Sequence, residues 1–177
     1  YAKALLYLGK ANKFLANYDV AIDAIARAQT FYEQLGQSEK VAECMHAIGL
    51  IYRRLNHYNK ALEFILKAGE IYDKLGDKKK LSIIFNNSGI IHDAMGNLNT
   101  ALENYKKALK IDEELKDLRG IAIVQKNIAL IYSQQGKTQE ALQLLNEVLA
   151  REEKLGEKQN ISITLLSIGL CYKSLKD

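Results

Sequence analysis

The chain has 177 residues, of which 48% are hydrophobic and 26% are charged, so its composition is that of a folded domain and excludes a disordered segment. The net charge of +4 is too small for a nucleic-acid-binding surface, which needs a dense basic stripe. The sequence contains no proline, so the commonest helix breaker is missing throughout.

Apolar residues recur at intervals of three and four along the chain, which is the spacing of one face of an α-helix. No useful length of the sequence alternates with a period of two, as a half-buried strand would. The pattern therefore predicts an all-α fold. In chain order, the expected helices are 2–16, 18–35, 38–56, 58–75, 78–96, 98–116, 118–136, 138–155 and 158–175.

The same residues return when the sequence is shifted by 40 positions, with no insertion or deletion. A column of small residues consists of Gly9, Gly49, Gly89, Ala129 and Gly169. An alanine column consists of Ala21, Ala61, Ala101 and Ala141. A third column pairs leucine with glycine at 35–36, 75–76 and 155–156. The register divides a single array, 1–177, into repeats 1–40, 41–80, 81–120 and 121–160 and a partial repeat, 161–177.

Each column has a physical meaning. Glycine in the middle of a helix costs about 1 kcal/mol relative to alanine, so its recurrence there predicts a close approach between helices. The Leu-Gly pairs predict a last apolar contact followed by a left-handed helix C-cap. Gly96 and Gly136 stand where the tighter turns between paired helices are expected.

These columns resemble the tetratricopeptide repeat family over essentially the whole chain. The second repeat carries the family residues Met45, Ile48-Gly49, Tyr52, Tyr58, Ala61, Ile65 and Ala68. The resemblance implies a right-handed superhelix of about four and a half helical hairpins. The usual repeat has about 34 residues and ends in proline. Repeats of 40 residues without proline resemble the elongated repeats of bacterial regulatory and sensor proteins.

In this family the first helix of each hairpin lines a concave groove, and an apolar stripe follows the implied groove from the second repeat onward. One column of the stripe is Lys10, Leu50, Ile90, Leu130 and Leu170. The other column, seven residues earlier, is Lys3, Glu43, Ile83, Ile123 and Ile163. Two helical turns separate the columns, so they share a face. The stripe predicts a groove for a partner helix or an extended peptide. The alternative is packing against the end of the preceding helix.

The polar neighbours of the stripe are His46, Asn86, Asn87, Lys126 and Asn127. The resemblance places Asn87 and Asn127 where an asparagine grips the backbone of a bound peptide, since an amide supplies both a donor and an acceptor. The alternative is that each asparagine bonds its own neighbours. Lys10, Lys13, Arg53 and Arg54 form a candidate basic pocket for an acidic peptide or a carboxylate. Its alternative is an ordinary solvated face.

The sequence predicts no catalytic, metal or cofactor site. His46, His57 and His92 are not spaced with cysteines or carboxylates as metal ligands are. No glycine-rich phosphate loop occurs. The pairs Glu113-Glu114 and Glu152-Glu153 are expected to lie on solvated faces at helix ends. The prediction is a non-enzymatic scaffold that binds a protein or peptide partner, without nucleic acid or a membrane.

Two other hypotheses remain open. The chain begins at Tyr1, not methionine, so it is expected to be a fragment, and it could be the sensory or regulatory input domain of a histidine kinase or transcriptional regulator. Helix 158–175 lacks a hairpin partner, so it could form a homodimer through Ile161, Leu165, Ile168 and Cys171.

Two further sequence features concern the compartment. Cys44 and Cys171 lie far apart in a linear array and are not expected to form a disulfide. Two lone thiols favour a cytoplasmic location, and a signal peptide elsewhere in the full-length protein would make it periplasmic. No apolar run reaches the roughly 18 residues that span a bilayer.

Overall fold

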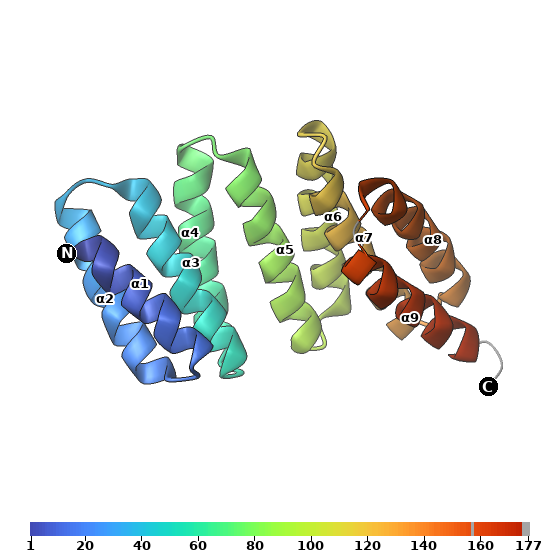
Figure 1. The fold of residues 1–177 in the computed structure, drawn as a ribbon, viewed down its shortest axis with the longest axis horizontal. Coiled ribbons are helices and arrows are strands. Elements are labelled where there is room, and N and C mark those ends of the chain that lie inside the picture. Colours follow the sequence, from blue (N-terminus) through green and yellow to red (C-terminus); the bar gives the residue numbers. More distant parts are fainter. Residues whose placement is uncertain (157, 175–177) are drawn as a thin grey trace. The chain divides into compact units, whose positions relative to one another are not determined.

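The computed structural model describes residues 1–156 and 158–174, and within these ranges all regular structure is α-helical (Figure 1). The helices are α1 (Ala2–Phe14), α2 (Tyr18–Gln34), α3 (Ser38–Arg54), α4 (Tyr58–Lys74), α5 (Lys78–Ala94), α6 (Leu98–Glu114), α7 (Leu118–Gln134), α8 (Thr138–Leu155) and α9 (Lys158–Ser174). Every helix expected from the sequence is present, and no described end differs from its expected position by more than two residues. The all-α prediction is therefore confirmed.

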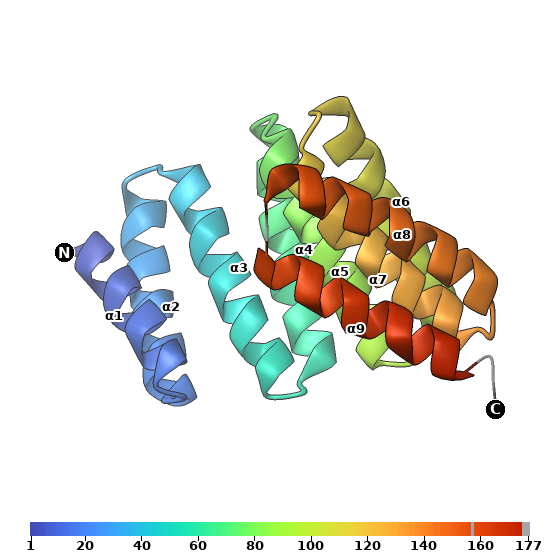
Figure 2. The ribbon, with the colours of Figure 1, turned by 45° about the vertical axis from the view of Figure 1, so that its right-hand side comes forward.

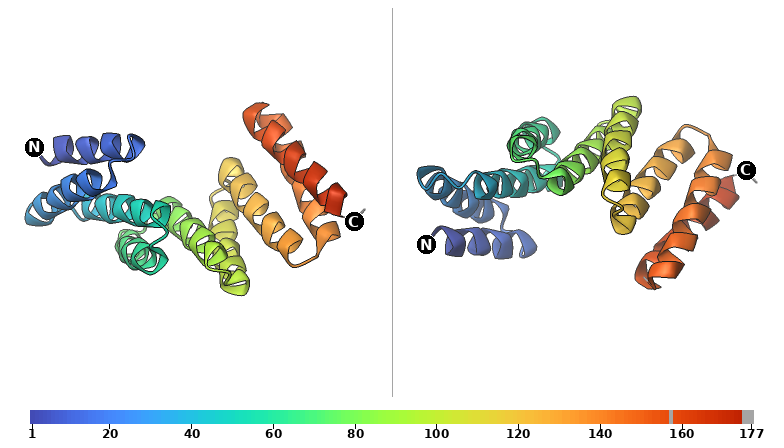
Figure 3. Two further views of the ribbon diagram at one scale, coloured as in Figure 1. Left: turned by 90° about the horizontal axis from the view of Figure 1, so that it is seen from below. Right: turned by 90° about the horizontal axis from the view of Figure 1, so that it is seen from above.

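The chain divides into two compact units, Tyr1–Ile91 and His92–Asp177, and each is described by itself. In the first unit, α1 packs on α2, α2 on α3 and α3 on α4 (Figure 1). The buried isoleucines of α5 join the core of α4. In the second unit, α6 packs on α7, α7 on α8 and α8 on α9 (Figures 2 and 3). Contacts therefore run mainly from one helix to the next, as in repeat proteins.

The small-residue column marks the closest approach within the hairpins. A Cβ atom built on Gly49 would lie 2.6 Å from Cγ1 of Ile65 and 3.1 Å from the carbonyl oxygen of Ala61. The same position in the first hairpin is tighter, because a Cβ on Gly9 would lie 2.3 Å from Cγ1 of Ile25. In the second unit Ala129 occupies this column and is buried. The predicted close approach is confirmed at Gly9 and Gly49.

The alanine column supplies the other side of each contact. Ala21, Ala61, Ala101 and Ala141 are all fully buried. Small side chains on both helices let the two backbones approach, and larger neighbours such as Ile25, Ile65 and Leu145 then fill the core around them. The hydrophobic core of each unit therefore follows the hairpins.

Left-handed residues close the turns between helices, as the Leu-Gly pairs predicted. Gly36, Gly76 and Gly156 have φ angles of +64°, +69° and +67°, a conformation that glycine adopts without steric cost. The turn after α2 also has the hydrogen bond expected of this cap, because the N–H of Gln37 donates to the carbonyl of Tyr32 at 2.9 Å. Lys116 takes the same conformation without glycine, with φ of +54°.

The terminal helix differs from its sequence-based description. The homodimer hypothesis needs Cys171 at the surface, but Cys171 is buried against Ala129 and Leu145, and Ile168 packs beside it. Ile161 is also partly buried. The reason is that this side of α9 packs on α8. Leu165 is exposed as expected. Among the described residues no helix has the length and hydropathy needed to cross a membrane.

Candidate functional site

The candidate groove residues of the first unit lie on α1, α3 and α5, the first helices of their hairpins. His46 on α3 and Asn87 on α5 meet there, with the Asn87 side-chain N–H donating to Nε2 of His46 at 2.9 Å. Burial, followed by the positive charges of Lys80, Lys13 and Arg53, lowers the pKa of His46 to about 4. The ring is therefore neutral at pH 7 and can accept this hydrogen bond. Asn87 thus bonds a neighbour within the chain, as one of the two interpretations expected.

This histidine predicts an acid-sensitive loss of stability. Its folded pKa of about 4 lies below its ordinary value of 6.5, so the unfolded chain binds more protons between these pH values. Stability is therefore present above the ordinary pKa and is lost as the pH falls toward the folded pKa. We expect the free energy of unfolding to fall by about 2 kcal/mol between pH 7 and pH 4.5, in urea titrations at both pH values.

The control for this prediction is His46→Gln, whose amide accepts the same hydrogen bond but does not titrate. Glu43 also acts on His46, in the opposite sense to the three cations, and it remains in both proteins. The variant should lose about 2 kcal/mol less than the parent over this range. An identical pH dependence in the two proteins would rule out His46 as the source.

Lys10, a member of the candidate basic pocket, forms an ion pair that the sequence did not reveal. Its Nζ lies 2.5 Å from Oε1 of Glu43, whose Oε2 lies 2.8 Å from Nζ of Lys40. Burial raises the pKa of Glu43, but the hydrogen bonds from the two lysines lower it by more, so the carboxyl stays ionised near neutral pH. The charge of Lys10 is therefore partly offset within the protein.

Lys13 lies in a different electrostatic setting, near the end of α1. Burial lowers the pKa of its ammonium group, and the charges of Arg54, Lys10 and Arg53 lower it further. The two arginines stand at the end of α3, so the cations of the two helices lie close enough to act on one another. This end of the first unit therefore has a positive potential.

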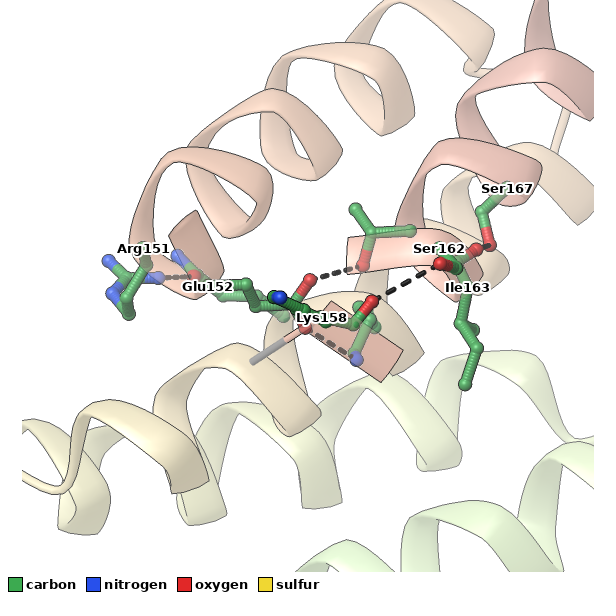
Figure 4. A network of polar contacts seen from close by, with 9 residues as sticks. Arg151, Glu152, Lys158, Ser162, Ile163 and Ser167 are labelled. Atoms are coloured by element: carbon green, nitrogen blue, oxygen red, sulfur yellow. Dashed lines mark hydrogen bonds and ion pairs between the residues drawn. The ribbon is translucent and has the colours of Figure 1, made fainter. Parts of the chain in front are cut away.

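A buried polar network joins α7, α8 and α9 in the second unit (Figure 4). The side chain of Glu152 is completely buried, with Oε1 2.7 Å from Nζ of Lys126 and Oε2 accepting from the Thr164 hydroxyl at 2.7 Å. The neighbouring Arg151 donates to the side-chain oxygen of Gln125. The expectation that Glu152 is solvated was wrong, because α9 covers this turn of α8. Glu113 and Glu153 are exposed, as expected.

The repeat register contained a signal for this buried acid. Glu152 falls in the same column as Tyr32 and Tyr72, which are both buried. Asp112 occupies the remaining place in that column and is buried too. A buried carboxylate in a column of core tyrosines requires a polar partner. The column therefore indicates a lysine on a facing helix as that partner.

The predicted apolar stripe is most exposed in the second unit. Leu130 on α7 and Leu170 on α9 are 51% and 61% exposed, and both line a pocket of about 140 Å³. Its lining residues are Lys126, Ala129, Leu130, Ser133, Leu145, Ser167, Leu170 and Cys171. Ile123, Ile163 and Leu166 extend the exposed apolar surface along the same two helices. In the first unit, Leu50 and Ile90 are partly buried, and Leu50 packs against the core around Ile65.

Cys44, which lies in the first unit, has a thiol of low reactivity. Burial, followed by the charge of Glu43, raises the pKa of Cys44 to about 12, so its thiol is protonated at neutral pH. Among the residues that the structure describes, no group of three or more histidine, cysteine or acidic side chains is placed to hold a metal ion.

The repeat pattern of this chain matches that of a known family. The tetratricopeptide repeat description matches residues 1–74, 80–154 and 120–177, which together cover almost all of the chain. The chain belongs to the tetratricopeptide repeat family. No curated protein matches this tetratricopeptide repeat chain in sequence.

Solved structures of other repeat proteins share the fold. Aspartyl phosphate phosphatase F from Bacillus subtilis matches with a TM-score of 0.87 and 16% identity, over 96% of this chain and 44% of that protein. The apo form of RapI matches with a TM-score of 0.88 and 17% identity, over 97% of this chain and 62% of RapI. The Rap conjugation gene regulator of plasmid pLS20, solved with a Phr peptide, has a TM-score of 0.73 and 23% identity over 96% of this chain and 50% of the regulator. This tetratricopeptide repeat chain spans less than two thirds of these relatives.

Proposed function

We propose that the chain is a non-enzymatic tetratricopeptide repeat scaffold that binds a protein or peptide segment through α7 and α9. The binding surface, called the inner face, is the exposed apolar surface formed by Ile123, Leu130, Ile163, Leu166 and Leu170. The observation that carries the proposal is the exposed apolar surface around the pocket, where Leu130 and Leu170 are both more than half exposed. Contiguous exposed apolar surface is characteristic of interaction sites, and a groove between helices accepts an amphipathic partner segment.

The size of the pocket indicates what enters it. An apolar cavity of about 150 Å³ can hold a benzene ring. A pocket of about 140 Å³ is therefore suited to one large apolar side chain of the partner. Asn127 on α7 is proposed to bond the partner backbone. Lys126 is held in place by Glu152, so its ammonium group gives the pocket a fixed polar edge.

The first unit is proposed to bind polar or acidic protein segments at a surface of its own. Lys13 and Arg53 supply the positive potential, and Asn86, Asn87 and Ile90 supply amides and one apolar contact beside them. Acidic segments are attracted to such a surface by charge-assisted hydrogen bonds. The pair formed by His46 and Asn87 must rearrange or bind as a unit if Asn87 is to meet the partner.

The structural relatives support the proposal without deciding it. One of them is a regulator solved with a bound peptide, and its repeat fold is shared by this chain. A sensory or regulatory input domain is the second candidate, favoured by the similarity to this regulator and to RapI. The phosphatase activity named for one relative is not proposed for this chain, because that relative is only 16% identical and shares the fold alone.

A displayed peptide library selected on the protein tests the proposal. We expect selected peptides to carry a large apolar residue and Leu130→Asp or Leu170→Asp to weaken their binding at least about tenfold, because a carboxylate would have to be desolvated in the pocket. Leu118→Asp is the control, since Leu118 is exposed to a similar degree on α7 but lies outside the pocket lining. Equal losses in the pocket and control variants, measured by fluorescence anisotropy, would refute the proposed site.

A further inference from the structure

A pocket of about 470 Å³ lies in the first unit, between α1, the end of α2 and the start of α3. The charged side chains of its lining are Lys3, Lys10, Lys40 and Glu43. Three lysines against one acid leave two positive charges in excess. We call this site the lysine pocket. It is separate from the inner face of α7 and α9, and neither Lys13 nor Arg53 belongs to its lining.

The charged groups of the lysine pocket form a continuous row. The ammonium groups of Lys3 and Lys10 lie 5.8 and 5.9 Å from the ring centre of Tyr7. The row continues from Lys10 to Glu43 and from Glu43 to Lys40 through the two ion pairs described above. A ring face and a carboxyl group therefore hold together three cations that would otherwise repel one another.

Lys3 is the member of this row without an acidic partner. Within the parts of the chain that the structure describes, this exposed lysine forms no ion pair, and its ammonium group lies over the Tyr7 ring. The single carboxylate of Glu43 is shared between Lys10 and Lys40. The lysine pocket can therefore accept a further anion beside Lys3 without losing either ion pair.

The excess charge indicates which anion fits. All the cations among the described lining residues are lysines. An ammonium group binds phosphate as a point charge, so several lysines can meet different oxygens of one phosphate group. A phosphate monoester carries about −1.5 to −2 charges at pH 7, which matches the excess of two, whereas a carboxylate would leave one positive charge uncompensated.

The remaining lining residues suit an aromatic ring attached to the phosphate. Leu6 and Tyr32 are buried lining residues, and Tyr7 adds an exposed ring. Aromatic rings pack favourably against such side chains in offset or edge-to-face arrangements. A cavity of about 150 Å³ holds a benzene ring, so the larger lysine pocket has room for a ring and a phosphate group together.

We propose that the lysine pocket is a binding site for an aryl phosphate monoester, that is, a phosphate dianion joined to an aromatic ring. The phosphate lies among the ammonium groups of Lys3, Lys10 and Lys40. The ring rests against Leu6 and Tyr32. A phosphotyrosine side chain of a protein segment and a free aryl phosphate present this same group, and the experiment below distinguishes the two sources.

Titration of the isotope-labelled full chain with phenyl phosphate, followed by nuclear magnetic resonance, tests the proposal. We expect saturable shifts of the backbone amides around Lys3, Lys10 and Lys40. Phenyl sulfate keeps the ring but carries one charge, and inorganic phosphate lacks the ring, so each should bind at least about tenfold more weakly. Equal binding of either control, or no saturable shift at about 10 mM phenyl phosphate, would overturn the proposal.

Lys3→Gln is the specific protein variant, because it removes a cation from the pocket without breaking an ion pair of the described chain. It should weaken phenyl phosphate binding at least about fivefold. Lys60→Gln is the matched control, since Lys60 is also exposed, lies 5.5 Å from the centre of the Tyr52 ring and is outside the pocket lining. Equal losses in the two variants would show unspecific attraction and refute the site.

A peptide containing phosphotyrosine separates the two sources of the ligand. Binding at least about tenfold tighter than that of phenyl phosphate assigns the site to a protein segment, and equal binding assigns it to a free aryl phosphate. Leu130→Asp alters the inner face of α7 and α9 and should leave phenyl phosphate binding unchanged. The lysine pocket and the inner face can therefore succeed or fail separately.

Discussion

Replacing Gly49 with leucine should lower the free energy of unfolding by more than about 3 kcal/mol. Even a single Cβ at this position would lie 2.6 Å from a side-chain atom of Ile65 and 3.1 Å from the backbone of Ala61. The backbone atom cannot rotate away, so α3 and α4 would have to separate along their length. The loss exceeds the roughly 1 kcal/mol that leucine gains over glycine in helix propensity. Urea-induced unfolding followed by circular dichroism would measure it.

The matched variant is Gly169→Leu, which changes the same column of the repeat in the open terminal helix. Because nothing lies within 4 Å of the new Cβ, only the gain in helix propensity remains, and stability should stay the same or rise by up to about 1 kcal/mol. If both substitutions destabilise the protein equally, close helix approach is not the reason for glycine in this column.

Removing the lysine cation of the buried network should lower the free energy of unfolding by a similar amount in the second unit. We expect Lys126→Met to lower the free energy of unfolding by about 3 kcal/mol, because it leaves the Glu152 carboxylate buried without the ammonium group that now lies 2.7 Å away. Methionine keeps most of the aliphatic volume of lysine, so the effect reports the charge. Thermal and urea unfolding of the variant would both show the loss.

The double variant Lys126→Met with Glu152→Leu separates charge from packing. Replacing both partners removes the unpaired charge and should recover most of the lost stability, leaving about 1 kcal/mol for the Thr164 hydroxyl that loses its acceptor. A double variant as unstable as the single one would show that packing of the lysine stem, not the ion pair, matters.

The elements of the fold could be predicted from the sequence because their determinants are local. Helix positions follow from apolar spacing, and the turn at Gly76 follows from a conformation that few other residues adopt. The contact at Gly49 was also expected, since glycine inside a helix is unfavourable unless close helix packing offsets its cost. All three inferences use residues within one hairpin and its repeats.

The candidate site was less predictable because its features depend on distant side chains. The ion pair between Lys10 and Glu43 joins residues 33 positions apart, and only the packing of α1 near α3 brings them together. Glu152 and Glu153 are adjacent in sequence, yet one is buried and the other exposed. Which of two adjacent acids faces inward depends on helix phase, and a shift of one residue reverses the answer.

Gly36, Gly76 and Gly156 give the turns between hairpins the same left-handed conformation. The hairpin is therefore a repeated structural unit. Because the helices within each unit pack mainly on their neighbours in the chain, a whole repeat can be added or removed without redesigning a distant core. Such a chain can change the length of its recognition surface by gene duplication while each junction keeps its packing. The 40-residue period is then the step size in which this protein can evolve new specificity.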